Sequence, residues 1–201
     1  MTEEAILHLT NVDRVLARLI KKIGPCTLIP RRRRTPFESL VRSVVFQQLN
    51  GTAASTILGR VKKLYPGRRF PRPQDLLDTS DAALRGAGLS RAKTAAVKDI
   101  AAKTLSGVVP SSREISQMPN QEILDRLTSL RGVGPWTVEM LLIFTLGRPD
   151  VLPITDYGVR KGFALTYGWK DLPKPKELLA FSEKWSPHRS TAAWYFWRAL
   201  D

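Results

Sequence analysis

The chain has 201 residues, 43% of them hydrophobic, and its 32 Lys and Arg against 18 Asp and Glu give a net charge of +14. This length and apolar content suffice for one compact domain with a sizeable core, which argues against disordered and fibrous classes. The lone cysteine, Cys26, excludes an internal disulfide, a four-cysteine zinc site and an iron–sulfur cluster. His8 and His188 lie far apart in the sequence, so surface or hydrogen-bonded roles are favoured over metal binding.

The hydrophobic pattern, the first residues and the net charge of the chain indicate its cellular compartment and its partner. No run of about 18 apolar residues occurs, and the first residues, M-T-E-E-A-I-L-H, lack the basic and apolar regions of a signal peptide. We therefore expect an intracellular protein without a membrane partner, in the cytoplasm or nucleoid of a prokaryote or the nucleus of a eukaryote. The excess positive charge favours a nucleic-acid partner over the alternative, a basic solvated surface on an ordinary enzyme.

Four consecutive arginines, Arg31 to Arg34, concentrate part of this charge in one loop. Three roles stay open for them: a solvated loop, an arm that contacts phosphates, and a nuclear-targeting patch.

Apolar residues recur at helical spacing along most of the chain, and neither an alternating strand pattern nor a solenoid repeat occurs. The spacing predicts an all-α fold. A first helix is expected over 12–23, ended by Gly24, and a second begins at Pro36. Later helices are expected after the caps Thr52, Ser90 and Asn120, and again from about residues 155, 174 and 187.

One stretch, L-T-S-L-R-G-V-G-P-W-T-V-E-M at 127–140, predicts a tight turn between two helices. Gly132 and Gly134 permit a sharp turn because glycine accepts positive φ, and Pro135 suits the first position of the helix that follows. The N–H groups and the dipole at a helix start favour an anion such as a phosphate. Asp156 follows at the start of a third helix, where it is either a cap or a catalytic carboxylate. We predict that the hairpin binds a nucleic-acid backbone while Asp156 does chemistry nearby.

Five segments carry a family resemblance: F-Q-Q-L-N-G-T-A-A at 46–54, G-L-S-R-A-K at 88–93, L-R-G-V-G-P-W-T at 130–137, L-P-I-T-D-Y-G-V-R-K at 152–161 and W-S-P-H-R-S at 185–190. Together they resemble the helix-hairpin-helix (HhH-GPD) DNA glycosylases, most closely the alkylation-repair branch, DNA-3-methyladenine glycosylase II. A lone G-V-G is weak evidence, whereas the order and spacing of all five are specific. The resemblance implies a two-lobed helical bundle with a cleft between a central lobe, about 36–150, and a terminal lobe, 1–35 with 151–201. We expect residues 1–201 to form a single glycosylase domain, without the N-terminal β-rich domain of longer members.

The resemblance implies that Asp156 is the catalytic residue. Its carboxylate would stabilise the positive charge that develops on the deoxyribose as the N-glycosidic bond breaks, and would orient the attacking water. Trp136 and Trp197 are expected to line the base pocket and stack on an electron-poor base. Met140 is expected in the pocket wall, where longer members often have a tyrosine. Other aromatic residues are expected in the core or at its rim: Tyr157, Phe163, Trp185 and Trp194.

Other positions match DNA contacts of the family. Leu49 matches the apolar wedge that fills the gap left by a flipped base, with Gln48 supporting the opposite strand; core packing is the alternative for Leu49. Lys93 is expected either to touch a phosphate or to be a plain exposed lysine. The phosphate contacts expected at the hairpin are Gly132, Gly134 and Thr137. No cofactor or essential metal is expected, although hairpin carbonyls sometimes hold Na⁺ or K⁺, which here would be those of Thr128, Leu130 and Val133.

Trp136 stands where glycosylases that also cleave the DNA backbone have a lysine nucleophile. We therefore expect a monofunctional glycosylase. The resemblance implies that it acts as a monomer and removes 3-methyladenine from double-stranded DNA, with 7-methylguanine as a further candidate substrate. Two alternatives stay open: a helix-hairpin-helix protein that binds DNA without cutting, and a bifunctional glycosylase and lyase for other damaged bases.

Overall fold

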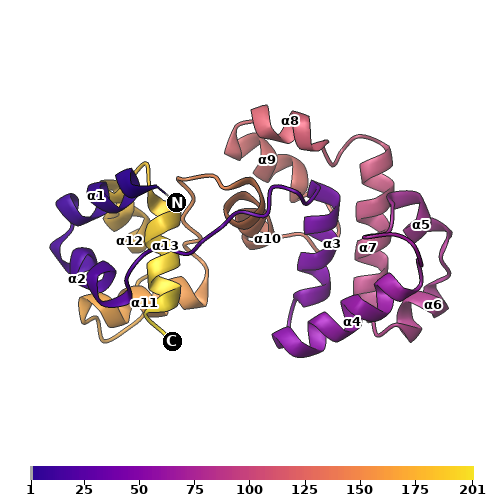
Figure 1. Cartoon of the computed structure of the whole chain (residues 1–201), viewed down its shortest axis with the longest axis horizontal. Coiled ribbons are helices and arrows are strands. Elements are labelled where there is room, and N and C mark those ends of the chain that lie inside the picture. Colours follow the sequence, from indigo (N-terminus) through magenta and orange to yellow (C-terminus); the bar gives the residue numbers. More distant parts are fainter. Residues whose placement is uncertain (1) are drawn as a thin grey trace. The chain divides into compact units, whose positions relative to one another are not determined.

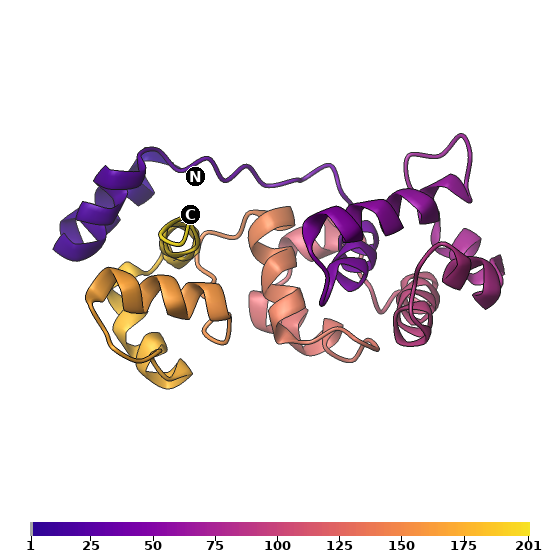
Figure 2. The same ribbon diagram turned by 90° about the horizontal axis from the view of Figure 1, so that it is seen from below.

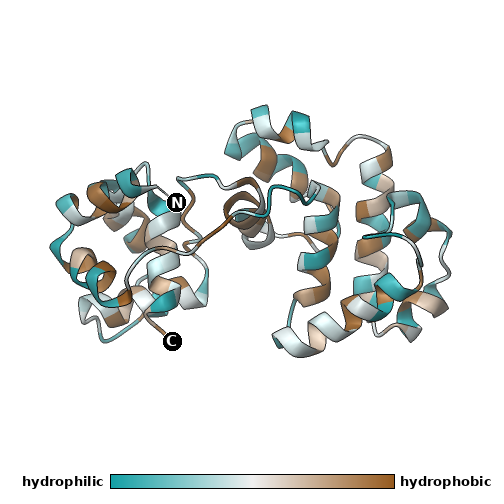
Figure 3. Cartoon of the chain, in the orientation of Figure 1, coloured by the Kyte–Doolittle hydropathy of each residue, from teal (hydrophilic) through white to brown (hydrophobic). Residues whose placement is uncertain are grey.

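The computed structural model describes residues 2–201 as helices joined by loops, and no strand occurs within this range. The predicted all-α fold is confirmed (Figure 1). The chain forms two compact units: unit 1 comprises residues 2–31 with Leu142–Asp201, and unit 2 comprises Arg32–Leu141. Hydrophobic and hydrophilic residues alternate along most helices (Figure 3), because each helix buries one face and exposes the other. None of the described helices is long and apolar enough to cross a membrane.

Unit 1 joins the two ends of the chain. The N-terminal helices meet at Asp13, whose side chain accepts hydrogen bonds from the N–H groups of Val15 and Leu16 and so begins the second helix. The sequence predicted only one helix here, over 12–23, and the preceding helix was missed. The elements of unit 1 are α1 (Glu3–Val12), α2 (Arg14–Ile23), the π-helix η1 (Leu142–Leu146), α11 (Tyr157–Tyr167), α12 (Pro175–Phe181), the 3-10 helix η2 (Ser182–Trp185) and α13 (Arg189–Arg198).

An aromatic cluster forms the core of unit 1. The ring of Phe163 on α11 stacks on that of Tyr167 at 4.5 Å and meets the rings of Trp185 and Phe196 edge-on. Helices α11 and α13 pack closely at Gly162, where an added Cβ would lie 2.0 Å from the carbonyl oxygen of Phe196 (Figures 1 and 2). Phe163, Trp185 and Trp194 are buried, whereas Tyr157 is 63% exposed. The expected core position is therefore confirmed for Phe163, Trp185 and Trp194, but not for Tyr157.

Unit 2 is built around the long helix α7, which packs against α3 and α5 (Figure 1). Ser90 caps α7 as predicted, since its hydroxyl accepts a hydrogen bond from the N–H of Lys93. The elements of unit 2 are α3 (Pro36–Phe46), α4 (Gly51–Lys63), α5 (Pro73–Asp78), α6 (Asp81–Gly86), α7 (Arg91–Leu105), α8 (Ser112–Gln117), α9 (Asn120–Leu127) and α10 (Pro135–Leu141).

Two predicted caps in unit 2 are wrong by one or two positions. Asn50, and not Thr52, caps α4: its side-chain oxygen accepts the N–H of Ala53 at 2.8 Å. Asn120 is the first helical residue of α9, and Pro119 occupies the cap position without a side-chain hydrogen bond. In each case several polar or turn-forming residues are neighbours, so the sequence located the turn but not the capping atom.

Backbone hydrogen bonds join residues 142–150 to the rest of unit 1. The N–H of Arg31 donates to the carbonyl of Phe144 at 2.8 Å, and the N–H of Ser190 donates to that of Pro149 at 3.0 Å. The bounds inferred from the sequence placed these residues with the central lobe.

Candidate functional site

Asp156 caps the N-terminus of α11 in unit 1. Its Oδ1 accepts the N–H of Val159 at 2.8 Å and the indole N–H of Trp197 at 2.9 Å. Asp156 is half-buried, and its neighbour Tyr157 is exposed. The structural interpretation of Asp156 as a helix cap is thus confirmed. A carboxylate that donors fix in place can also act on a substrate, so its catalytic role stays a prediction.

Gly158 makes the contact between Asp156 and Trp197 possible. A Cβ at Gly158 would lie 2.9 Å from Cδ1 of Trp197 and 3.2 Å from Oδ1 of Asp156, so any side chain would displace the indole. The Trp197 ring also lies 5.4 Å from that of Phe144. The sequence suggested only base stacking for Trp197, and stacking stays a prediction. The role of its N–H in holding Asp156 was missed.

The hairpin between α9 and α10 in unit 2 depends on one glycine with positive φ, not two. Gly132 has a φ of 74°, whereas Gly134 is absent from the described residues with positive φ, so that part of the prediction is wrong. The carbonyl of Gly134 instead accepts the N–H groups of Thr137 and Val138 at the start of α10. Both glycines are exposed, and no atom lies within 4 Å of the place where a Cβ of Gly134 would be. The backbone at Gly134 is therefore open to close approach.

Thr137 does not fit the predicted phosphate contact. Its exposed fraction is 2%, and its Oγ1 accepts a hydrogen bond from Nε2 of Gln47 at 3.3 Å. Its N–H donates to Gly134. Both polar groups therefore have partners inside unit 2, which argues against a phosphate contact by Thr137.

The corner between α3 and α4 contains the predicted wedge. Leu49 is 39% exposed, so core packing does not describe it, and its role as a wedge stays a prediction. Gln48 is exposed and has a φ of 56°, the one positive φ outside glycine among the described residues. Such a conformation persists where neighbouring bonds hold it.

Gln47 and Lys93 supply those bonds. Nε2 of Gln47 donates to the carbonyl of Gly132 at 2.9 Å, and Nζ of Lys93 donates to the carbonyls of Val45 at 2.8 Å and Gln47 at 2.7 Å. Lys93 is half-buried, and burial lowers the pKa of its ammonium. The exposed-lysine alternative is therefore wrong, and the role of Gln47 was missed by the sequence analysis.

Trp136 and Met140 both lie on α10, four residues apart and so on one face of the helix. Trp136 is 40% exposed and Met140 is half-buried. Their roles in a base pocket stay predictions.

The predicted cation site at Thr128, Leu130 and Val133 also stays a prediction. The carbonyl of Leu130 already accepts the N–H of Val133 at 3.1 Å, which leaves one lone pair of that oxygen for a cation.

Among residues 2–201, no group of three or more His, Cys, Asp or Glu side chains could hold a metal ion. His8 and His188 are nevertheless close in space, with ring centroids 5.2 Å apart, so their separation in the sequence was misleading.

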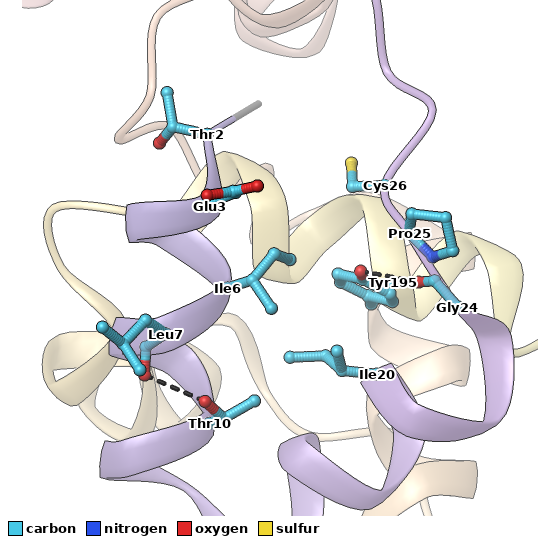
Figure 4. A pocket seen from close by; sticks show the side chains of 10 residues that line it. All are labelled: Thr2, Glu3, Ile6, Leu7, Thr10, Ile20, Gly24, Pro25, Cys26 and Tyr195. Carbon is cyan, nitrogen blue, oxygen red and sulfur yellow. Dashed lines mark hydrogen bonds between the residues drawn. The ribbon is translucent and has the colours of Figure 1, made fainter.

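A pocket of about 460 Å³ lies in unit 1 between α1 and the end of α2 (Figure 4). Apolar side chains such as Ile6, Leu7 and Ile20 dominate its lining, and the hydroxyl of Tyr195 donates to the carbonyl of Gly24 at 2.9 Å. None of the predicted site residues lines it. We therefore do not assign it to the site.

The run Arg31–Arg34 is contacted by Arg69, which lies in a second basic loop, between α4 and α5. Nη2 of Arg69 donates to the carbonyl of Arg33 at 3.2 Å and to Oε2 of the buried Glu38 at 2.8 Å. Arg32 and Arg33 themselves are exposed. This arrangement places positive charge from two loops side by side, and the role of the run stays open.

Comparisons with known proteins agree with one another. A family model described as "HhH-GPD superfamily base excision DNA repair protein" matches residues 41–188. The chain is 37% identical over 198 residues to "DNA-3-methyladenine glycosylase 1" of Schizosaccharomyces pombe, which covers 97% of this chain and 86% of that protein. A solved structure, the 3-methyladenine DNA glycosylase Mag1 of that yeast with abasic DNA, matches with a TM-score of 0.88 at 37% identity over 97% of this chain and 95% of the other. A Bacillus halodurans DNA-3-methyladenine glycosidase matches with a TM-score of 0.87 at 34% identity over 98% and 89%.

Proposed function

Because the chain belongs to the HhH-GPD superfamily of base excision DNA repair proteins, in the branch of the DNA-3-methyladenine glycosylases, we propose that it is a monofunctional glycosylase for alkylated purines in double-stranded DNA. The observation that carries the proposal is the carboxylate of Asp156, which two N–H donors hold at the start of α11 and which is partly exposed beside the exposed Tyr157.

The chemistry needs little beyond that carboxylate. A purine alkylated at N3 or N7 carries a positive charge, so it accepts the electron pair of the breaking glycosidic bond without a strong general acid. Positive charge then develops on the deoxyribose, where a negative side chain stabilises it. Water adds to C1′ and loses a proton, and the Asp156 carboxylate is the group proposed to orient that water. The products are the free base and an abasic site.

The DNA contacts in the proposal come from unit 2. The exposed hairpin at Gly132 and Gly134, with the backbone open at Gly134, would approach a phosphate, and the exposed Leu49 would fill the space left by the flipped nucleotide. Stacking on a flipped base is also proposed for Trp136 of unit 2 and, separately, for Trp197 of unit 1. The protein is proposed to act as a monomer, without a cofactor.

A base-release assay tests the proposal directly. Purified protein is incubated with duplex DNA treated with a methylating agent, and the released bases are separated by chromatography. Release of 3-methyladenine, with or without 7-methylguanine, is expected, and abasic sites should become strand breaks only after alkali. Binding without release would support the alternative of a DNA-binding protein without activity.

Strand cleavage without alkali, together with covalent trapping by borohydride, would instead support the lyase. That result would contradict the prediction that the protein is monofunctional, which rests on Trp136, because this side chain has no amine to form a Schiff base. A panel of lesions in the same assay would define the substrate range, which the half-buried Met140 is proposed to widen.

A further inference from the structure

Helix α7 contacts both parts of unit 2 that are proposed to touch DNA. At its start, Nζ of Lys93 binds the carbonyls of Val45 and Gln47 at the corner between α3 and α4. Further along, Oδ2 of Asp99 accepts the N–H of Arg131 at 2.8 Å, and Nζ of Lys103 donates to the carbonyl of Ser129 at 2.8 Å. The last two bonds hold the chain just before the hairpin glycines.

These contacts come from one face of the helix. Lys93, Ala96, Asp99 and Lys103 follow one another at intervals of three or four residues, which is the spacing of a single helical face. Ala96 is where the hairpin rests, since an added Cβ at Gly132 would lie 3.2 Å from the Cβ of Ala96. From Lys93 to Lys103 the helix rises about 15 Å, at about 1.5 Å per residue.

Gln47 joins the corner to the hairpin directly, through its bond to the carbonyl of Gly132 at 2.9 Å. The corner, α7 and the hairpin are thus each hydrogen-bonded to the other two. The corner includes Gln48, with its φ of 56°, and the exposed Leu49. A strained corner that carries a wedge needs such support, because a wedge that yields cannot unstack a base.

We propose that this face of α7 fixes the distance between the wedge corner and the phosphate-binding hairpin, and that Lys93 and Gln47 are positioning residues for base flipping. This inference rests on the proposed function. It replaces the phosphate contact first suggested for Lys93, because its ammonium already binds two carbonyl oxygens at the end of α3, where the helix dipole is negative.

Lys93→Met tests the proposal, since it removes the donors and keeps the length of the side chain. Lys98→Met is the matched control: Lys98 lies on the same helix, carries the same charge and pairs with Asp81 at 2.6 Å. Each variant is assayed on one lesion in two duplexes, one fully paired and one with an abasic site opposite the lesion. The second duplex presents a base that is easier to extrude.

On the paired duplex, Lys93→Met is expected to slow base release about tenfold, because the corner loses both hydrogen bonds from the ammonium. On the duplex with the opposing abasic site the loss should be much smaller. Lys98→Met should behave like the wild type on both. Lys93→Arg still supplies N–H donors for both carbonyls and should restore most of the activity. Gln47→Leu, which removes the other link, should repeat the pattern of Lys93→Met.

Two outcomes would overturn the proposal. If Lys93 contacts a phosphate, the slope of log affinity against log salt would fall by about 0.9 in Lys93→Met and not in Lys98→Met. If Lys93 only stabilises the fold, release would fall equally on both duplexes, in parallel with the melting temperature. A wild type that releases no base from either duplex would refute the proposed function instead. The fluorescence of 2-aminopurine in the duplex would then still report whether Lys93 and Gln47 support unstacking.

Discussion

Two aspartates of unit 1, Asp13 and Asp156, accept the same types of hydrogen bond but lie in different surroundings. Each caps a helix N-terminus with its side chain. Each also accepts a hydrogen bond from a tryptophan indole: Trp185 donates to Asp13 at 3.0 Å, and Trp197 donates to Asp156 at 2.9 Å. A carboxylate bonded to an indole at a helix start is therefore no evidence of catalysis by itself.

The difference lies in burial and in the elements that each carboxylate joins. Asp13 is 4% exposed, and its Oδ2 binds the hydroxyl of Tyr167 at 2.6 Å and the ammonium of Lys184 at 2.9 Å, in addition to the indole of Trp185. Its donors come from α2, α11 and η2, so it joins elements distant in the sequence. Asp156 is half-buried and stands beside an exposed tyrosine. The comparison indicates that Asp13 stabilises the fold, whereas Asp156 stays partly exposed to solvent.

The largest effect on stability is expected for Asp13→Asn. The substitution removes the buried negative charge that accepts hydrogen bonds from Tyr167 and Trp185 and pairs with the partly exposed Lys184, and the loss of hydrogen bonds to a charged group costs about 3 kcal/mol. Urea unfolding monitored by circular dichroism measures this loss. Base release per folded molecule should stay close to that of the wild type. A variant of normal stability without activity would show that Asp13, and not Asp156, is the carboxylate that the chemistry needs.

Paired tryptophan substitutions sharpen the comparison. Trp185→Phe should lower the free energy of unfolding by about 2 kcal/mol, because Asp13 loses a donor inside the core. Trp197→Phe should change stability less and slow base release about tenfold, because Asp156 loses the donor that orients it. Urea unfolding and single-turnover release, measured on both variants, check this. Equal effects of the two substitutions on stability and release would remove the distinction.

Gly158→Ala tests the Asp156 site without replacing Asp156 or Trp197. The new methyl group would lie 2.9 Å from Cδ1 of Trp197, so the indole must move, at a cost of about 1 kcal/mol. We expect base release to slow roughly fivefold. Gly59→Ala is the control, because no atom lies within 4 Å of its added Cβ. Normal release by Gly158→Ala would mean that the bond between Trp197 and Asp156 does not matter.

The smallest expected effect is a pH dependence. Burial alone would raise the pKa of Asp13, but hydrogen bonds from Tyr167, the Leu16 amide, Trp185 and Lys184 outweigh it and lower the pKa. A carboxyl whose pKa is lowered on folding contributes stability that is complete above its unfolded pKa of about 3.9 and is lost as the pH falls below it. The stability difference between wild type and Asp13→Asn should therefore shrink below about pH 4. A difference that is constant from neutral to acid pH would contradict this.

The sequence predicted best what depends on neighbouring residues. Gly24, Pro36 and Ser90 act within four positions of themselves, and the structure has the expected helix boundary at each. The same holds for Asp156, whose cap bond reaches only to Val159. Where two candidates adjoin, as at Asn50 and Thr52, the local pattern could not choose between them.

Bonds between distant residues were not visible in the sequence. Lys93 binds carbonyls 46 and 48 residues away, and Gln47 binds a carbonyl 85 residues away. Thr137 was expected at a phosphate because it follows the hairpin, yet it turns inward to Gln47. Side chains that bind backbone carbonyls leave no repeating pattern, so only the folded chain reveals them.

The central claim is that Asp156 carries out the chemistry, and single-turnover base release by Asp156→Asn tests it most directly. Asparagine caps helices about as well as aspartate, so the free energy of unfolding should change little. Removing the negative charge should slow the release of 3-methyladenine about 100-fold or more, with DNA affinity largely retained. Release at the wild-type rate by a folded Asp156→Asn protein would contradict the claim.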